Sequence, residues 1–419
     1  MTFEAEAKVT RVRHSLARAL GLFAKVGWAA SFLTLFATMT TGYPQPAWVA
    51  PLSQLGALVA VASTLSMIAS FIVSFARMPA PAVVRAHGAG LSLQRGAARV
   101  PVEVASAHAT PGAFGGGVVE VTARDGDVWE IELDAPERGP ELVRALGFGP
   151  GGKPTTFALA SRFRRLLHLA VGYGAYNIGS MLGFMVGALV GAAVGAPDTL
   201  FTLQFPATVV VVAALYAAGK RLVSAPEVTV GADGVRVRRF GFQTRFYPLA
   251  ELVAAEQLAW GGPILLRLSS GAVVTVGGVI VDARRRDALA EHVRALLAAR
   301  DAARTVHAES VARGGRSVRA WRAHLRALLE GGYRTASTAL TREALAELVA
   351  RPGAPLDQRV GAALALRVSG DVEASARIRV AADQCVDAST RAALEAAATE
   401  EAEELQDERL ERLLGPSSP

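Results

Sequence analysis

The sequence predicts an α-helical membrane protein with four transmembrane helices in two hairpins, two cytoplasmic α+β domains and an all-α C-terminal domain. Three observations lead to this fold class. Hydrophobic residues make up 51% of the 419 residues, whereas charged residues make up 19%. Four apolar stretches reach the roughly 20 residues that cross a bilayer. Basic residues flank these stretches on one side. The predicted spans are about Leu20–Gly42, 48–76, Leu166–Ala196 and about Leu200–Gly219.

The basic residues predict the topology of the four spans. Arginines precede the first and third stretches and basic residues follow the second and fourth, whereas the turns 41–50 and 194–200 contain no Lys or Arg. By the positive-inside rule, both termini and most of the chain lie in the cytoplasm, in a multi-pass membrane protein. The net charge of +7 then reflects topology and contact with membrane lipids, and nucleic acid is excluded as a partner.

The third apolar stretch carries a glycine at every fourth position in "GSMLGFMVGALVGAAVG" (179–195). Residues four apart lie on one face of a helix, and in a bilayer small residues let two helix backbones approach closely. This pattern predicts a glycine zipper for helix packing. Its partner is either another helix of the chain or the same helix of a second copy in a homo-oligomer. The residues are Gly179, Gly183, Gly187, Gly191 and Gly195.

Each hairpin is followed by a segment with the pattern of β-strands, which predicts an internal duplication. Residues 84–133 and 228–280 both begin with a short apolar strand and a glycine turn, and both end in a pair of alternating strands. Asp125-Gly126 and Ser270-Gly271 stand where tight hairpin turns belong. A helical segment closes each unit, at 136–148 and 281–300.

This succession of strands and a closing helix directly after a hairpin resembles the bacterial pleckstrin-homology-like (PH-like) domains of membrane proteins. The resemblance implies a protein of a bacterial inner membrane, with a scaffold or partner-binding module that lies against the inner leaflet. Phosphoinositide binding is not carried over, because no matching motif is visible in the sequence.

After Arg300 the sequence predicts a linker and then short amphipathic helices with breaks at 330–334, 351–355 and 369–371. These helices resemble HEAT-like helical repeats and imply a surface for protein partners. The predicted domains are the N-terminal segment with the first hairpin (1–78), the first PH-like domain (79–150), a linker with the second hairpin (151–222), the second PH-like domain (223–300), a linker (301–317), the helical domain (318–414) and a disordered tail (415–419).

Two groups of residues are candidates for contact with lipid or with an acidic partner. Arg316, Arg319 and Arg322 recur at helical spacing beside an apolar stripe that contains Trp321. They form either an interfacial helix on anionic lipid or the first helix of the C-terminal domain. Arg236 and Arg238 alternate with valines and share the exposed face of a strand, which predicts a basic surface or a solvated face.

The sequence contains no motif that predicts catalysis. "GFGPGGKPT" (147–155) has the spacing of a phosphate-binding loop, but Pro154 stands where the Ser or Thr that binds Mg²⁺ belongs. The seven histidines are scattered and Cys385 is the single cysteine. We therefore expect no catalytic, cofactor-binding or metal-binding residue, and a non-enzymatic, membrane-anchored scaffold or regulatory protein. The alternative is a component of a small-molecule or lipid transporter or channel, with Tyr173 and Asn177 lining a pathway.

Overall fold

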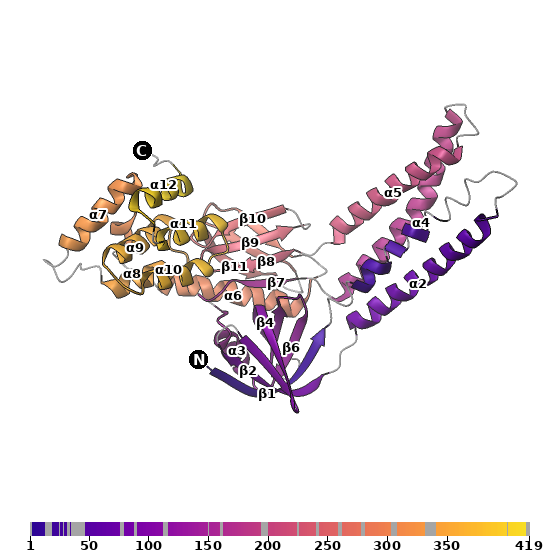
Figure 1. Cartoon of the computed structure of the whole chain (residues 1–419). Helices are drawn as coiled ribbons and strands as arrows, with labels where there is room; N and C mark the ends of the chain where they lie inside the picture. Colours follow the sequence, from indigo (N-terminus) through magenta and orange to yellow (C-terminus); the bar gives the residue numbers. More distant parts are fainter. Residues whose placement is uncertain are drawn as a thin grey trace.

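The structure, a computed structural model, has an α+β fold that combines two β-modules, a group of long helices and a helical domain (Figure 1). It describes residues 2–12, 19–24, 26–27, 29–31, 34, 47–75, 79–87, 90–111, 116–149, 151–159, 162–193, 200–223, 226–239, 243–258, 262–277, 281–302, 308–331, 341–399 and 401–415.

The first β-module is a closed six-stranded barrel followed by helix α3. Neighbouring strands pair antiparallel in sequence order, and β1 closes the barrel by pairing with both β2 and β6. Asp125-Gly126 forms the predicted hairpin turn between β5 and β6, with Gly126 at a φ of 84°. The elements are β1 (Thr2–Val12), β2 (Ala80–His87), β3 (Gly90–Arg95), β4 (Ala98–Pro111), β5 (Gly117–Ala123), β6 (Val128–Leu133) and α3 (Arg138–Ala145).

The second β-module has two antiparallel sheets and helix α6 around one apolar core. One sheet has the order β10-β9-β8-β7 and the other has the order β11-β12-β13. Leu289, Val293 and Leu296 of α6 are buried in this core. The elements are β7 (Thr155–Ala158), β8 (Glu227–Val230), β9 (Gly234–Arg239), β10 (Gln243–Pro248), β11 (Leu252–Gln257), β12 (Ile264–Leu268), β13 (Val273–Val276) and α6 (Ala283–Ala302).

Long helices interrupt both β-modules after their first strand. Helix α2 (Val49–Phe75) stands between β1 and β2, and helices α4 (Arg162–Ala193) and α5 (Leu200–Val223) stand between β7 and β8. The long helices project away from the modules as an arm (Figure 1). Their outward faces are apolar, since Leu58 on α2 is 67% exposed and Leu189 on α4 is 69% exposed. The arm therefore differs from the two β-modules, each of which buries most of its large apolar side chains in a core.

The prediction of four transmembrane helices is wrong. The described residues contain one helix that is long and apolar enough to cross a membrane by length and composition, Val49–Ser70 within α2. The apolar stretches of α4 and α5 are shorter, at Met181–Val190 and Pro206–Gly219. The stretch in α4 rises about 15 Å, half of the roughly 30 Å of a bilayer's hydrocarbon core. The multi-pass inner-membrane location with cytoplasmic termini depended on four spans and is withdrawn with them. Much of the first predicted span lies outside the described residues.

The strands of the two β-modules also correct the predicted fold class. The sequence predicted a small sheet with a closing helix in residues 79–150, whereas the structure closes a barrel with a strand from residues 2–12. It also places strand β7 in residues 151–222, which were predicted to hold a linker and spans. Each β-module thus begins one strand earlier than the sequence predicted, ahead of its helical interruption.

The C-terminal domain consists of short helices around a core of its own. The predicted breaks at 351–355 and 369–371 are confirmed, because helices end and begin on either side of them. Trp321, Val360 and Leu394 are among its fully buried side chains. The elements are η2 (Ala308–Val311), α7 (Val318–Gly331), α8 (Arg342–Ala350), α9 (Leu356–Val368), α10 (Ala374–Asp383), α11 (Ala388–Ala398) and α12 (Glu403–Leu414).

Candidate functional site

Buried polar side chains gather at three places: between the barrel and the second β-module, between that module and the helical domain, and between α7 and α12. Among the described residues, no group of three or more His, Cys, Asp and Glu side chains could hold a metal ion. The chemistry that these three places offer is therefore described contact by contact.

The barrel and the second β-module are joined by polar contacts to β7. The backbone N–H of Thr156 donates to Ser106 Oγ on β4 at 3.0 Å, and that hydroxyl donates to the Thr156 carbonyl at 3.2 Å. Arg285 on α6 adds a second link. Its Nε donates to Glu120 Oε2 on β5 at 2.9 Å, and its Nη1 donates to the Ala158 carbonyl at 2.9 Å. These contacts connect the two modules through side chains that are largely buried.

Two histidines lie at this junction with their rings close to Phe157: His108 is buried and His292 is half-buried. The ring of His108 on β4 lies 4.8 Å from that of Phe157, and the ring of His292 on α6 lies 5.7 Å from it. Burial, together with the Arg285 cation, lowers the pKa of His108 to about 3. Burial, together with His108, lowers the pKa of His292 to about 4. Both side chains are therefore neutral packing groups at neutral pH.

The second β-module holds the helical domain through the turn between β8 and β9. The carboxylate of Asp233 accepts two backbone N–H groups from the α10–α11 loop, from Val386 to Oδ1 and from Asp387 to Oδ2, both at 2.7 Å. Ala232 beside it donates its N–H to the Gln384 carbonyl at 3.0 Å and accepts the N–H of Gly353 at 2.8 Å. We call these four hydrogen bonds the Asp233 clamp.

The clamp requires a close approach of two backbones, which explains a glycine at its base. A Cβ atom on Gly231 would lie 2.5 Å from Val386 Cγ2 and 2.6 Å from the Gln384 carbonyl oxygen. Such distances leave no room for a side chain. The glycine turn predicted here from the sequence is therefore also the part of the second β-module that contacts the helical domain.

The charges around the clamp belong to different domains. Burial raises the pKa of Asp233, although the N–H groups of Val386 and Asp387 and the Arg359 cation act in the opposite direction. Arg359 on α9 is fully buried and donates to the Val349 carbonyl at 2.9 Å and to Cys385 Sγ at 3.3 Å. Burial raises the pKa of Cys385 to about 11, so this thiol stays protonated at neutral pH. The Asp233 carboxylate thus reduces the cost of burying a cation in the neighbouring domain.

The basic residues predicted on β9 bind groups of the protein. Arg236 and Arg238 alternate with buried valines as predicted, and Arg238 is exposed. Arg236 is half-buried and donates through Nη2 to the Val386 carbonyl beside the clamp. Arg238 lies 3.4 Å from Glu227 on β8. Arg236 therefore belongs to the contact between the domains and is not free for lipid.

The structure separates the four predicted contact residues on and before α7 into two that are buried and two that are half-buried or exposed. Trp321 is fully buried and donates Nε1–H to the Val311 carbonyl at 2.9 Å, and Arg322 is 5% exposed. Neither can reach a lipid headgroup, which corrects the prediction for these two residues. Arg319 is exposed, and Arg316 is half-buried with its Nη1 donating to the Arg313 carbonyl at 3.1 Å. Of the two roles left open, α7 takes that of a helix within the C-terminal domain.

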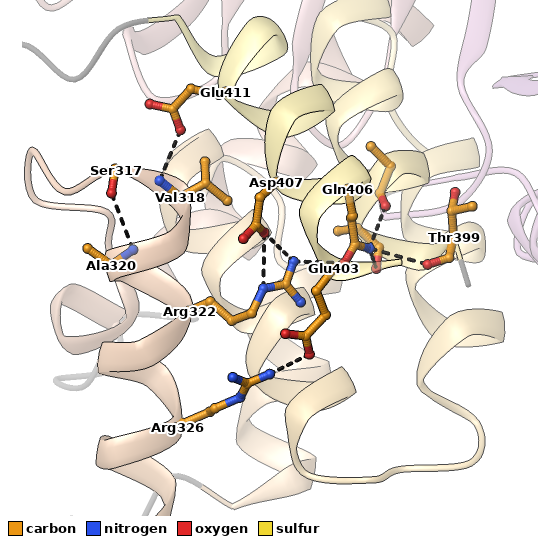
Figure 2. A network of polar contacts seen from close by, with 12 residues as sticks. Ser317, Val318, Ala320, Arg322, Arg326, Thr399, Glu403, Gln406, Asp407 and Glu411 are labelled. Carbon is orange, nitrogen blue, oxygen red and sulfur yellow. Dashed lines mark hydrogen bonds and ion pairs between the residues drawn. The ribbon is translucent and has the colours of Figure 1, made fainter. Parts of the chain in front are cut away.

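Arginines on and before α7 pair with acidic residues of α12, and we call this set the α7–α12 ladder (Figure 2). Arg322 Nε donates to Asp407 Oδ1 at 3.0 Å, and Arg326 pairs with Glu403. Glu411 completes the set. Its Oε1 accepts from Arg313 Nη2 at 2.6 Å and its Oε2 accepts the backbone N–H of Val318 at 2.9 Å. The acidic helix α12 is therefore bound to the basic helix α7 of its own domain.

Two of the five predicted zipper glycines pack against α5 of the same chain. A Cβ atom on Gly183 would lie 2.2 Å from Thr208 Cα, and one on Gly179 would lie 2.9 Å from Val212 Cα. Gly187 is buried as well. Gly195 lies outside the described residues, as does the environment of Gly191. The side chains of Tyr173 and Asn177, predicted for a transport pathway, also lie outside the described part of the structure.

A comparison of the chain with protein-family models, curated proteins and solved structures finds no match. The site is therefore defined by its own contacts. Sequence reasoning missed Asp233 and the α10–α11 loop that binds it. The available signal was an aspartate in a turn whose neighbours, Ala232 and Val235, are apolar, because such a turn is suited to burial rather than to solvent.

Proposed function

We propose that the chain is a non-enzymatic interaction protein, in which the β-modules carry the C-terminal helical domain as a docking platform for a protein partner. The Asp233 clamp carries this proposal. Four hydrogen bonds fix the helical domain to the second β-module, which is itself joined to the barrel through Ser106 and Arg285. A platform held in one orientation loses less freedom when a partner binds, which favours binding.

The described residues with strongly shifted pKa values support the same function. His108 and Cys385 are buried and His292 is half-buried, and the pKa shifts hold all three neutral at neutral pH. A general base or nucleophile needs a pKa near the working pH and access to a substrate. None of these three groups has such a pKa, and His108 and Cys385 are also buried. The resemblances to PH-like and HEAT-like domains stay predictions. The seven strands and closing helix described in the second β-module support the PH-like one.

The alternative prediction, a transporter or channel component, has less support. It depended on four spans around a pathway, and the described residues contain one helix long and apolar enough to cross a membrane. No described side chain adds a new argument for it. We therefore retain the interaction protein.

Site-specific photocrosslinking in cells tests the proposal with the full chain. A photoreactive amino acid replaces, one at a time, exposed side chains of the helical domain: Val372, Val380 and Leu405, which are 97%, 58% and 60% exposed. Glu103 and Arg124 on the barrel, whose side chains are 78% and 74% exposed, serve as matched positions. We expect a protein adduct from at least one helical-domain position and none from the barrel. Absence of an adduct from all three helical-domain positions would contradict the docking platform.

A further inference from the structure

Helix α12 is attached to the helical domain with little apolar burial. Of its residues, Gln406 and Leu410 are buried, whereas Leu405 is 60% exposed and Leu413 and Leu414 are half-buried. Leu410 joins the domain core. Gln406 donates to the carbonyls of Ala396, Ala397 and Thr399 at the end of α11. Leu413 and Leu414 also pack against this core at the end of α12. Over residues 403–411, Leu410 and Gln406 are the buried side chains, and the rest of the attachment there comes from charge.

The charges form one stripe on α12. Glu403, Asp407 and Glu411 are spaced four residues apart and therefore lie on the same helix face. Figure 2 shows this face turned toward α7, with Asp407 beside Arg322 and Glu403 beside Arg326. The two helices are antiparallel, because acidic residues further along α12 pair with arginines earlier in the chain.

The pairs differ in how strongly they hold α12. Arg326 and Glu403 are 44% and 56% exposed, so solvent and salt weaken their attraction. Arg322 and Asp407 are 6% and 17% exposed, so their pairing must offset the cost of taking both charges out of water. When α12 leaves, these charges return to water. The ladder is therefore selective for an acidic helix without binding α12 as firmly as an apolar interface of the same size would.

Removal of α12 would leave a basic surface that has a defined pattern. Arg313, Arg322 and Arg326 would lose their carboxylates, and exposed Arg319 stands on the same helix. Beside them would remain the position of Leu410 and the free carbonyls at the end of α11. Such a surface fits a helix with the pattern Glu-x-x-Gln-Asp-x-x-Leu-Glu, as in residues 403–411.

We propose that α12 is a displaceable strap over a docking surface for an acidic amphipathic helix of a partner protein. This rests on the proposed function, of which it names the partner class and the regulation. The partner presents carboxylates at four-residue spacing and a leucine between the last two, and it binds by replacing α12 on α7. An anionic membrane would offer negative charge without this spacing, without the leucine and without the glutamine that caps α11, so the contacts favour a protein helix.

The test compares two full-length variants that lose the same charge from the same helix. In the strap variant, Glu403→Gln and Asp407→Asn remove two carboxylates of the ladder. In the control variant, Glu404→Gln and Glu408→Gln remove two exposed carboxylates of α12. The probe is a fluorescent peptide of residues 401–415, with a scrambled peptide of the same composition beside it. We expect the probe to bind the strap variant about tenfold more tightly than the wild type or the control variant.

The binding must also weaken as NaCl rises from about 50 to 500 mM, because the ladder is electrostatic. Equal affinity for all three proteins, or equal binding of the scrambled peptide, would overturn the proposal. Binding of the strap variant to phosphatidylserine vesicles without binding of the peptide would overturn it in favour of a membrane. A partner found by photocrosslinking would still support the docking platform in either case.

A second measurement needs no variant and covers the case in which the strap variant fails to fold. Hydrogen exchange of the wild-type chain is followed at low and high NaCl. We expect backbone amides of α12 to exchange faster as salt rises, whereas those of α11 stay protected. Equal protection of α12 and α11 at every salt concentration would overturn the proposal.

Discussion

The carboxylate of Asp233 accepts the backbone N–H of Val386 at 2.7 Å across 153 residues of chain. This bond joins a turn of the second β-module to a loop of the helical domain, and the N–H of Asp387 adds a second bond to the same carboxylate. Together with the Ala232 backbone and Arg236, this side chain joins two domains whose apolar cores are separate.

Replacement Asp233→Asn should open the clamp. The amide has one acceptor oxygen for two N–H groups, and an unsatisfied buried N–H costs about 1–3 kcal/mol. Cys385, the one cysteine of the chain, lies in the same loop, and its pKa of about 11 leaves the thiol unreactive until the loop opens. We expect labelling of Cys385 by a disulfide reagent at pH 8 to accelerate about 5- to 150-fold. The control is Asp383→Asn, at an exposed position of α10, which should label at the wild-type rate. Equal rates for the two variants would contradict the clamp.

The buried side chain of His108 should make stability fall in mild acid. The pKa of His108 is lowered from 6.5 to about 3, so between these values the unfolded chain binds a proton that the folded chain does not. The histidine therefore contributes stability above pH 6.5 that is lost as the pH falls. From pH 7 to pH 5 we expect a loss of about 2 kcal/mol from this side chain in denaturant unfolding. His108→Gln should reduce the pH dependence by that amount, whereas His87→Gln, at an exposed position, should leave it unchanged.

The packing of α4 on α5 should depend on Gly183. A Cβ atom there would meet the Thr208 backbone at 2.2 Å, so Gly183→Ala must separate the helices at a cost of about 1–3 kcal/mol. Gly174 on the same helix has no neighbouring atom within 4 Å of such a Cβ. Gly174→Ala should therefore keep or raise the thermal midpoint, since alanine favours a helix by about 1 kcal/mol. Equal midpoints for the two variants in thermal unfolding would show that Gly183 does not determine the packing.

The hydrogen bond of Trp321 should be measurable apart from its packing. Trp321→Phe keeps an aromatic ring and leaves the buried Val311 carbonyl without its donor, which should cost about 1–3 kcal/mol in urea unfolding. Trp321→Ala should cost about 3–5 kcal/mol, because a cavity is added. Trp48→Phe, at a position 51% exposed, should change stability little. A Trp321→Phe variant as stable as the wild type would rule out this contribution.

Local patterns in the sequence predicted local structure well. The pairs Asp125-Gly126 and Ser270-Gly271 form the expected hairpin turns. A tight turn between two strands needs a positive φ, which glycine adopts at both positions. The breaks between the C-terminal helices follow from Pro352 and Gly370 in the same way. Such features depend on neighbours in the chain, which the sequence displays.

Features that depend on distant parts of the chain could not be predicted this way. Strand β1 has alternating apolar residues, but its partners begin at residue 80, beyond a long helix, so the segment was interpreted as a flank of a span. The periodicity around Trp321 showed an apolar stripe without showing that protein covers it. The apolar neighbours of Asp233 indicate burial, but its two donors lie in a loop of another domain, which the local sequence does not reveal. The hydropathy of residues 166–196 predicted a full span, whereas the apolar stretch of α4 among the described residues is Met181–Val190.

The interrupted barrel constrains how the protein is made. Val9 of β1 pairs with both Ala80 and Ile131, so the first strand cannot complete either ladder until residues far along the chain have left the ribosome. Bringing such distant residues together is entropically costly and slows folding. Until then β1 presents an unpaired edge that can associate with other chains. The chaperone demand of this protein during synthesis should therefore be concentrated on its first strand, before the helical domain exists.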